Sequence, residues 1–250
     1  MLDYLFPDLR VRNTTDHEEM DRADADPEKL FRSIRQFERI NFLFSASRRL
    51  LRRYVFSVME QQPKRTYTLL DVGAGGCDIS RWAAREARRR RLRLQITALD
   101  NNPRILSLAR QAVRDAPEIK IVEGTALDLD RLDPFDFVFS NHLLHHLSWD
   151  EMEIFLRGAI ARTRRALIVN DLKRSGWAHA GGTLCIGLLA RRSFSLHDGR
   201  LSIRRGFLPE ELRDFVQRRF PGTPLQVVET APARVVLVLP DGRRVGGGRP

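Results

Sequence analysis

The sequence predicts an α/β fold in which helices cover both faces of a mostly parallel sheet. Short apolar segments alternate with amphipathic ones between residues 66 and 170. A glycine-rich segment at 71–78 directly follows the first apolar segment, and two neighbouring apolar segments at 225–239 end the pattern. Because a chain of 250 residues can bury one substantial core, we expect one main domain with added segments.

The N-terminal part predicts a polar arm followed by helices. Residues 1–26 are polar and acidic, and we expect a flexible arm there. Asp26 and Pro27 have the pattern of an N-cap followed by proline at the first helical position. Apolar residues at three- and four-residue steps then predict one or two helices over 27–62. These helices precede the first strand, so they could form a lid across the mouth of the sheet.

The central part predicts five strands separated by helices. The expected strands are 66–72, 92–99, 119–123, 135–140 and 166–170. The expected helices are 79–90, 103–115 and one that starts at the capping box Ser148–Glu151. Strands that alternate with helices in this way form parallel sheets, so residues 63–240 should hold the main domain.

After residue 171 the alternation stops. Residues 171–206 contain an apolar stretch, 177–190, which glycines interrupt and which is shorter than the roughly 18 to 20 residues of a bilayer span. We interpret it as a buried or interfacial helix. A turn signal at Asp198 and Gly199 predicts a short hairpin in the same segment. The segment as a whole is interpreted as a cap inserted over a substrate.

The C-terminal part predicts a helix and an edge hairpin. The helix covers 209–219, and strands at 225–229 and 234–239 are joined by a short link, which favours antiparallel pairing. Residues 241–250 are rich in glycine and arginine, and we expect a disordered tail.

Composition limits the partners and the location. The net charge of +11 suggests nucleic acid, because basic proteins gain affinity by releasing phosphate counterions. However, the basic residues are scattered over different expected elements, and only four of the 43 are lysine, as in a GC-rich genome. We therefore expect no nucleic-acid partner. The two cysteines form neither a metal pattern nor a disulfide framework, and no secretion signal is recognisable, which favours the cytoplasm.

The glycine-rich segment predicts a ligand site. Glycine lets the backbone turn tightly and approach a ligand closely at the carboxyl end of the first strand, where Asp71 lies. Asp100 ends the second expected strand, where a carboxylate can accept both hydroxyls of a ribose. The two features leave open whether the ligand is a methyl donor or a dinucleotide, and a tight turn without a ligand is the alternative.

Two later features resemble the class I S-adenosylmethionine-dependent methyltransferases. The segment 135–141 followed by 142–147 is similar to their fourth-strand region, and the closing hairpin is similar to the reversed last strand of their sheet. The resemblance covers about 66–240. It implies a Rossmann-like, seven-stranded, mostly parallel sheet with an antiparallel edge hairpin, and S-adenosylmethionine as the cofactor.

The resemblance also implies which residues hold the cofactor. These are Asp71, Gly73, Ala74 and Gly75 at the methionine part, Asp100 at the ribose, Asn101, Thr125, Ala126 and Leu127 around the adenine, and Asn141 at the end of the fourth strand. Two residues depart from the family pattern. Cys77 replaces a third glycine, and Thr125 stands where many relatives have an aspartate that contacts the adenine amine.

A histidine cluster, His142, His145 and His146, follows the fourth expected strand. Histidine suits general base catalysis near neutral pH. The stretch 139–148 resembles plant small-molecule O-methyltransferases in which the matching histidine deprotonates the acceptor hydroxyl, so His145 is the first candidate for the base. His146 and His142 are the others. The alternative is that these histidines only pack under the cofactor.

The expected cap adds candidates for the acceptor side. His197 beside Asp198 is a second possible base, although a surface histidine in a turn is the commoner case. The aromatic residues Trp177, Phe194 and Phe207 could line an acceptor pocket or belong to the core.

A fuller resemblance rests on three stretches, Glu38–Asn41, Val169–Ser175 and His197–Gly199. Together they look like bacterial methyltransferases of aromatic polyketide and phenolic-lipid pathways in secondary metabolism. That resemblance implies O-methylation of a small aromatic substrate. We expect no metal and no membrane span, and the sequence leaves a homodimer open. The alternatives left open are C-methylation of quinone precursors, RNA methylation and a non-catalytic methyltransferase-like module.

Overall fold

The computed structural model describes residues 7–22, 24–189 and 193–241. Within these ranges seven strands form one sheet in the order β3-β2-β1-β4-β5-β7-β6. Strands β1 to β5 pair in parallel, and β7 runs antiparallel to both β5 and β6. Their bounds are β1 (Thr66–Val72), β2 (Arg93–Asp100), β3 (Ile119–Glu123), β4 (Phe135–Asn141), β5 (Thr163–Leu172), β6 (Gln226–Thr230) and β7 (Arg234–Leu239). The predicted mostly parallel sheet with an antiparallel edge hairpin is confirmed.

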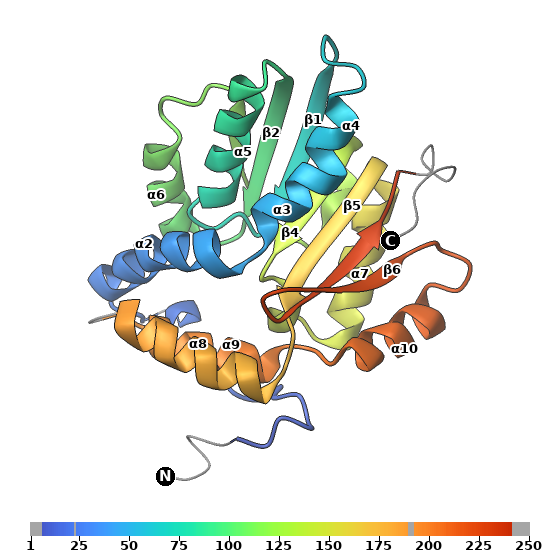
Figure 1. Cartoon of the computed structure of the whole chain (residues 1–250). Helices are drawn as coiled ribbons and strands as arrows, with labels where there is room; N and C mark the ends of the chain where they lie inside the picture. Colours follow the sequence, from blue (N-terminus) through green and yellow to red (C-terminus); the bar gives the residue numbers. More distant parts are fainter. Residues whose placement is uncertain (1–6, 23, 190–192, 242–250) are drawn as a thin grey trace.

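Helices cover both faces of the sheet (Figure 1). On one face lie α3 (Ser47–Leu51), the π-helical turn η2 (Arg52–Phe56), α4 (Ser57–Met59), α5 (Asp78–Arg89) and α6 (Pro103–Ala112). On the other face lie α7 (Trp149–Ala161) and α10 (Pro209–Arg219). The central strands are apolar on both sides because each side packs against helices, as Leu70 and Phe137 show by being fully buried. None of the described helices is long and apolar enough to cross a membrane.

The N-terminal helices divide between two positions. Helix α2 (Pro27–Phe44) starts at its N-cap Asp26, whose carboxylate accepts a hydrogen bond from Lys29 N at 2.9 Å. It lies beyond the carboxyl ends of the parallel strands (Figure 1). The next segments instead bury Leu51 and Phe56 in the core of one sheet face. Of the expected lid, therefore, α2 alone lies over the strand ends.

The segment expected to contain a hairpin forms two helices, α8 (Gly176–Leu189) and α9 (Ser195–Arg205). The predicted turn at Asp198 and Gly199 is wrong, because both residues lie in the first turns of α9. The Asp198 carboxylate accepts hydrogen bonds from Glu19 N at 2.9 Å and Met20 N at 3.1 Å. The aspartate thus joins the helix to the N-terminal arm, a role that the local sequence does not reveal.

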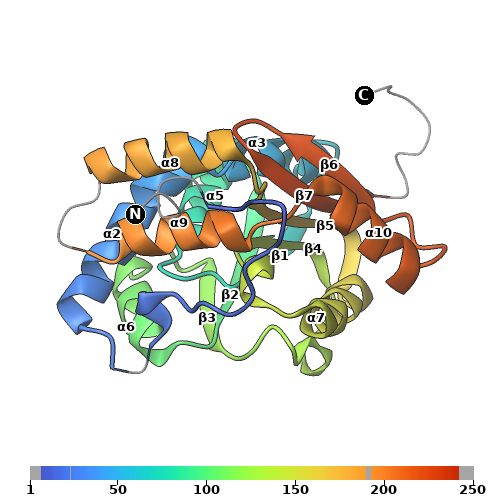
Figure 2. The same ribbon diagram turned by 90° about the horizontal axis from the view of Figure 1, so that it is seen from below.

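The arm, expected to be flexible, is anchored over residues 7–22, which include the short 3-10 helix η1 (Glu19–Asp21). Arg12 is buried and donates to Arg205 O at 2.8 Å and Leu147 O at 2.9 Å. Arg174, which comes shortly after β5, also holds the arm, because its guanidinium donates to Leu9 O at 2.8 Å. Figure 2 shows the arm running along α9. Residues 1–6 of the expected arm and 242–250 of the expected tail lie outside the described residues.

Candidate active site

The glycine-rich loop after β1 turns back on the end of β2. Gly73 and Gly75 have φ of +70° and +53°, a region that favours glycine. Gly73 N and Ala74 N both donate to Leu99 O, at 2.9 and 3.0 Å. A Cβ added at Gly73 would lie 3.3 Å from the Leu143 side chain. Any larger residue at Gly73 would therefore strain the turn and crowd the site.

Cys77, the departure from the family pattern, keeps the backbone conformation of a glycine. Its φ is +58° and its amide donates to Ala74 O at 2.9 Å. Burial, together with the neighbouring carboxylates, raises the pKa of its thiol far above the ordinary value. Cys77 therefore stays a neutral thiol inside the loop, and the replacement leaves the turn intact.

Three carboxyl groups surround the loop. Burial raises the pKa of Asp71 to about 7, and Asp78 and Asp100 add to this, although the hydroxyl of Ser80 donates to Asp71 at 2.5 Å. Burial also raises the pKa of Asp78 to about 6. A cation bound beside these groups would favour their ionised forms, whereas a pyrophosphate would be repelled. The loop is therefore suited to a positively charged ligand and unsuited to a dinucleotide.

Asp100 joins the end of β2 to the glycine loop. Its Oδ2 accepts from Gly75 N at 2.8 Å and its Oδ1 accepts from Asn102 N at 3.0 Å. A carboxylate oxygen can accept more than one hydrogen bond, so an oxygen that accepts from a backbone amide can also accept from a ribose hydroxyl. The carboxylate is thus held in position before any ligand arrives.

All of the predicted site residues line one pocket of about 550 Å³. They are Asp71, Gly73, Ala74, Gly75, Asp100, Asn101, Thr125, Ala126, Leu127, Asn141, His142, His145 and His146. The volume lies in the range of small-molecule and cofactor sites. The structure therefore brings the predicted set together, while its contacts with a cofactor stay a prediction.

Thr125 and Asn141, two further polar residues of this set, are held by hydrogen bonds within the protein. Thr125 Oγ1 accepts from Leu127 N at 3.2 Å and so stabilises the local turn. Asn141 Oδ1 accepts from Ser47 Oγ at 3.0 Å and from Asn170 Nδ2 at 2.7 Å. Asn141 is therefore fixed by α3 and by β5.

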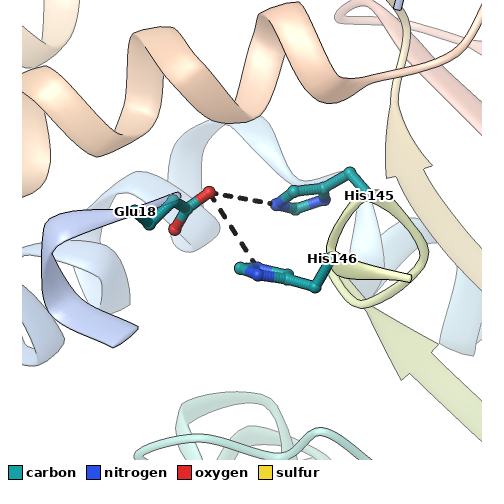
Figure 3. A group of neighbouring side chains, drawn as sticks. All are labelled: Glu18, His145 and His146. Atoms are coloured by element: carbon teal, nitrogen blue, oxygen red, sulfur yellow. Dashed lines mark ion pairs between the residues drawn. The ribbon is translucent and has the colours of Figure 1, made fainter. Parts of the chain in front are cut away.

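His145 is enclosed between two carboxylates. Its ring is 2% exposed; Nδ1 lies 2.7 Å from Asp171 Oδ1, and Nε2 lies 3.5 Å from Glu18 Oε1 (Figure 3). Its backbone N also donates to Asp171 Oδ2 at 3.2 Å. Burial alone would lower the pKa of His145, but Asp171 and Glu18 outweigh it and raise the value to about 9. Asp171 fixes the ring, and Nε2 is the nitrogen toward Glu18.

The other two histidines differ from His145 in their surroundings. His146 Nε2 lies 4.0 Å from Glu18 Oε1, and its side chain is 30% exposed. His142 has a φ of +60°, and its Nε2 contacts the guanidinium of Arg234. Burial and the charge of Arg234 hold the pKa of His142 well below 6.5. Because its Nε2 already faces a cation, His142 is the weakest of the three as a base.

Glu18 is the residue that the sequence did not single out. It comes from the arm, is 3% exposed, and accepts from Ser202 Oγ at 2.5 Å. Burial would raise its pKa, but His146, His145 and Ser202 outweigh this and lower the pKa to about 2. The sequence shows it only as one of several acids in a polar arm. Asp171 was also missed, although it follows the apolar segment of β5 and so had a strand-end signal.

The ligand atoms of Glu18, His145 and His146 lie within 4.8 Å of one another, so these residues could also hold a divalent metal ion. A protonated His145 already supplies the positive charge that Glu18 and Asp171 need. Ion pairs therefore account for the arrangement, and the expectation that no metal takes part stays a prediction.

The expected acceptor-side residues lie elsewhere. Trp177 is 90% exposed on α8, so its placement in a pocket wall is wrong. Phe194 and Phe207 are buried in packed clusters, in agreement with the core alternative. His197 lies on α9 outside this pocket, which removes it as a base. The pocket is lined instead by apolar residues of the arm, of α2 and of the segment 142–148 between β4 and α7, which we call the β4 loop. They are Met20, Ile34, Phe37, Leu143 and Leu147.

A seven-stranded sheet with a reversed last strand and an acidic glycine loop at the end of β1 is the fold of the class I S-adenosylmethionine-dependent methyltransferases. Residues 69–166 match the family model described as a methyltransferase domain. Over these residues the chain is similar to a methyltransferase domain, and the predicted class, fold and cofactor, S-adenosylmethionine, are confirmed. The resemblance to methyltransferases of aromatic polyketide and phenolic-lipid pathways stays a prediction. No curated protein sequence matches the chain significantly.

Solved structures with the same fold include three methyltransferases. The plantazolicin methyltransferase BpumL has a TM-score of 0.61 and 11% identity, with 87% of this chain and 91% of that chain covered. Human N-acetylserotonin methyltransferase has a TM-score of 0.59 and 16% identity, with 96% of this chain and 65% of that chain covered. An S-adenosylmethionine-dependent methyltransferase from Aquifex aeolicus has a TM-score of 0.57 and 16% identity, with 85% of this chain and 97% of that chain covered. At these identities the similarity establishes the fold alone.

Proposed function

We propose that the protein transfers a methyl group from S-adenosylmethionine to a hydroxyl oxygen of a small aromatic, phenolic or polyketide-type metabolite. The observation that carries this proposal is the position of His145, which is paired with the buried Asp171 and lines the same pocket as the acidic glycine loop. The apolar residues from α2 and the β4 loop suit the ring of such an acceptor.

Residues of the loop and of β2 would hold the cofactor. Asp100 is placed to accept the ribose hydroxyls, and Asp71 lies where a carboxylate would stabilise a nearby ammonium or sulfonium group. The bound cofactor supplies the electrophilic methyl group. Because Gly73 has no side chain, the cofactor could approach its backbone closely, whereas a Cβ there would lie 3.3 Å from the Leu143 side chain.

His145 is proposed as the general base. Asp171 accepts the Nδ1–H and holds the ring, so that Nε2 could take the proton of the acceptor hydroxyl while its oxygen gains the methyl group and the sulfur–carbon bond of the donor breaks, which would leave a neutral thioether. Asp171 also stabilises the imidazolium that forms. Glu18 accepts from this imidazolium at Nε2 when no acceptor lies between them.

Activity is expected to rise with pH. With a pKa of about 9, His145 is mainly protonated at neutral pH, and only its neutral form can act as a base. Below that value kcat/KM should increase about tenfold per pH unit and then level off. The check is a pH profile of kcat/KM under saturating S-adenosylmethionine.

The rising part of this pH profile, its acidic limb, could also come from ionisation of the acceptor phenol. The variant Glu18→Gln separates the two causes. Removing the carboxylate that raises the pKa of His145 should move the limb to lower pH. An acidic limb that stays at the same pH would contradict the base role, since the phenol titrates independently of Glu18.

The raised pKa of His145 also stabilises the fold below pH 6.5, and this contribution is lost as pH rises through about 9. Circular dichroism should therefore be recorded at each pH of the profile.

Removal of metal ions is expected to leave turnover unchanged. The ion pairs around Glu18 and His145 need no metal, so enzyme dialysed against a chelator should keep its full rate. Loss of activity that Mg²⁺, Mn²⁺ or Zn²⁺ restores would instead assign Glu18, His145 and His146 to a metal site.

Product analysis tests the function itself. Calorimetry should show binding of S-adenosylmethionine and none of NAD, and mass spectrometry with NMR of the product should show an O-methyl group on a phenolic acceptor. C-methylated quinone precursors, or methylated RNA as the only product, would replace the proposal by one of its alternatives.

The proposal also includes the location of the protein and the roles of two segments. We propose a cytoplasmic role in secondary metabolism, with α2 as the lid and 171–206 as the cap over the substrate.

A further inference from the structure

Helix α9 has two chemically different faces. One face meets the active site, since Ser202 Oγ donates to Glu18 and Arg205 Nε donates to His145 O at 2.9 Å. The residues at 197, 200, 201 and 204 follow the i, i+3, i+4, i+7 spacing of a single helical stripe on another side. The two sides therefore line different cavities.

That stripe lines a second cavity of about 290 Å³. Its walls come from three segments, α9, α8 and the arm, which lie side by side in Figure 2. The side chains with polar or charged ends are Asp16, His17, His179, His197, Arg200 and Arg204. Among the described residues that line it, two guanidinium groups face a single carboxylate, so these side chains carry more positive than negative charge.

Two nitrogen atoms at this cavity have no hydrogen-bond partner in the described part of the chain. They are His179 Nε2 and Arg204 Nε, and both atoms are buried. His179 as a whole is only 4% exposed. A buried polar atom without a partner is costly, so native proteins rarely retain one unless a ligand or water completes it.

The existing charges make an anion the fitting ligand. Burial, and after it the charges of Arg200 and Arg204, lowers the pKa of His179. An anion would relieve this repulsion. Asp16 is the competing carboxylate, but its Oδ2 lies 3.6 Å from Arg204 Nη1 and its side chain is half exposed, so an incoming group could displace it.

We propose that this cavity is a binding site for a phosphate-type oxyanion, either inorganic phosphate or the phosphate of a small monoester. Arg200 and Arg204 lie one helical turn apart on α9 and both line the cavity, and guanidinium groups bind phosphate through paired hydrogen bonds. The ligand would contact the arm and α9 together. The site is distinct from the methyl-transfer pocket and does not depend on the proposed function.

The test titrates inorganic phosphate into the full-length protein saturated with S-adenosylhomocysteine, so that the main pocket is filled. Calorimetry should show millimolar binding, and the ¹⁵N signals of the His179 and His197 rings should shift. The variants Arg204→Gln and His197→Gln should each weaken phosphate binding about tenfold. His197 has a half-exposed side chain, so its variant remains informative if Arg204→Gln fails to fold.

The control variant is Arg218→Gln on α10, which removes the same charge from a side chain that is 76% exposed and pairs with Asp214. It should leave phosphate binding unchanged. Equal weakening in this control would attribute the binding to the net charge of +11 and overturn the site. Acetate bound as tightly as phosphate, or no phosphate bound at all, would overturn it too. Phenyl phosphate distinguishes the sources: tighter binding than inorganic phosphate indicates a monoester, and weaker binding indicates the free ion.

Discussion

Replacing His145 with alanine is expected to lower turnover by about 10²- to 10³-fold, the usual contribution of a positioned general base. The affinity for S-adenosylmethionine should stay the same, because the residues proposed to hold the cofactor lie on the glycine loop and at the end of β2. Stopped-time assays of methyl transfer, with calorimetry of cofactor binding on the same preparation, measure both quantities.

The alanine variant leaves Asp171 and Glu18 as buried carboxylates without their imidazole, which lowers stability. The variant Asp171→Asn therefore supplies a second measurement. It keeps the shape and a hydrogen bond but removes the charge that orients and stabilises the imidazolium, so turnover should fall by at least about tenfold. Its pH profile should move to lower pH, because Asp171 helps to raise the pKa of His145.

Trp177→Ala is the matched control, since it removes a large ring from the exposed surface of α8. Unchanged turnover in this control together with loss in both variants supports the base. Full turnover in His145→Ala would remove the residue from that role and leave it as a packing residue beneath the cofactor.

The sheet could be predicted from the sequence because its signals are local. The bounds of β1, β3 and β7 agree with the expected strands, and helix α10 agrees at both ends, Pro209 and Arg219. Each of these elements has an apolar pattern of its own and is bounded by turn or capping residues. The strand-end positions of Asp71 and Asp100 then follow from the parallel order of β1 and β2.

Residues 195–205 could not be predicted in the same way. An Asp-Gly pair predicts a hairpin when only neighbouring residues are considered. In the structure the Asp198 carboxylate binds two backbone amides of the arm, about 180 positions away in sequence, and an acidic residue is also favourable in the first turn of α9. Tertiary contacts therefore overrode the local signal.

Glu18 shows the same limit at the site. Its role depends on Arg12 and Arg205, which bind the carbonyl of His145 and hold the arm under α9. Among the described residues, backbone carbonyls accept the hydrogen bonds of both guanidinium groups, and a charge pattern in the sequence does not indicate such partners. The histidines were predictable, since they directly follow β4, but the carboxylate opposite them comes from a segment whose composition indicates a solvated arm.

Replacing Asp100 with alanine is expected to weaken the binding of S-adenosylmethionine by about 10²-fold. Two hydrogen bonds between a carboxylate and ribose hydroxyls are together worth roughly 3 kcal/mol, which corresponds to that factor. The same change removes the acceptors of Gly75 N and Asn102 N, so the loop itself is also less well held.

A comparison of two ligands assigns this loss to the ribose. S-adenosylmethionine and S-adenosylhomocysteine share the ribose and differ at the sulfur, so Asp100→Ala should weaken both by the same factor. Asp71→Asn should weaken the sulfonium ligand more, because its buried carboxyl lies where we place the positive charge. Asp130→Ala, an exposed aspartate paired with Arg162, should change neither affinity. Unchanged binding in Asp100→Ala would remove this carboxylate from the ribose site, whereas an unequal loss would move it toward the sulfur, and with it the position of the methyl group relative to His145.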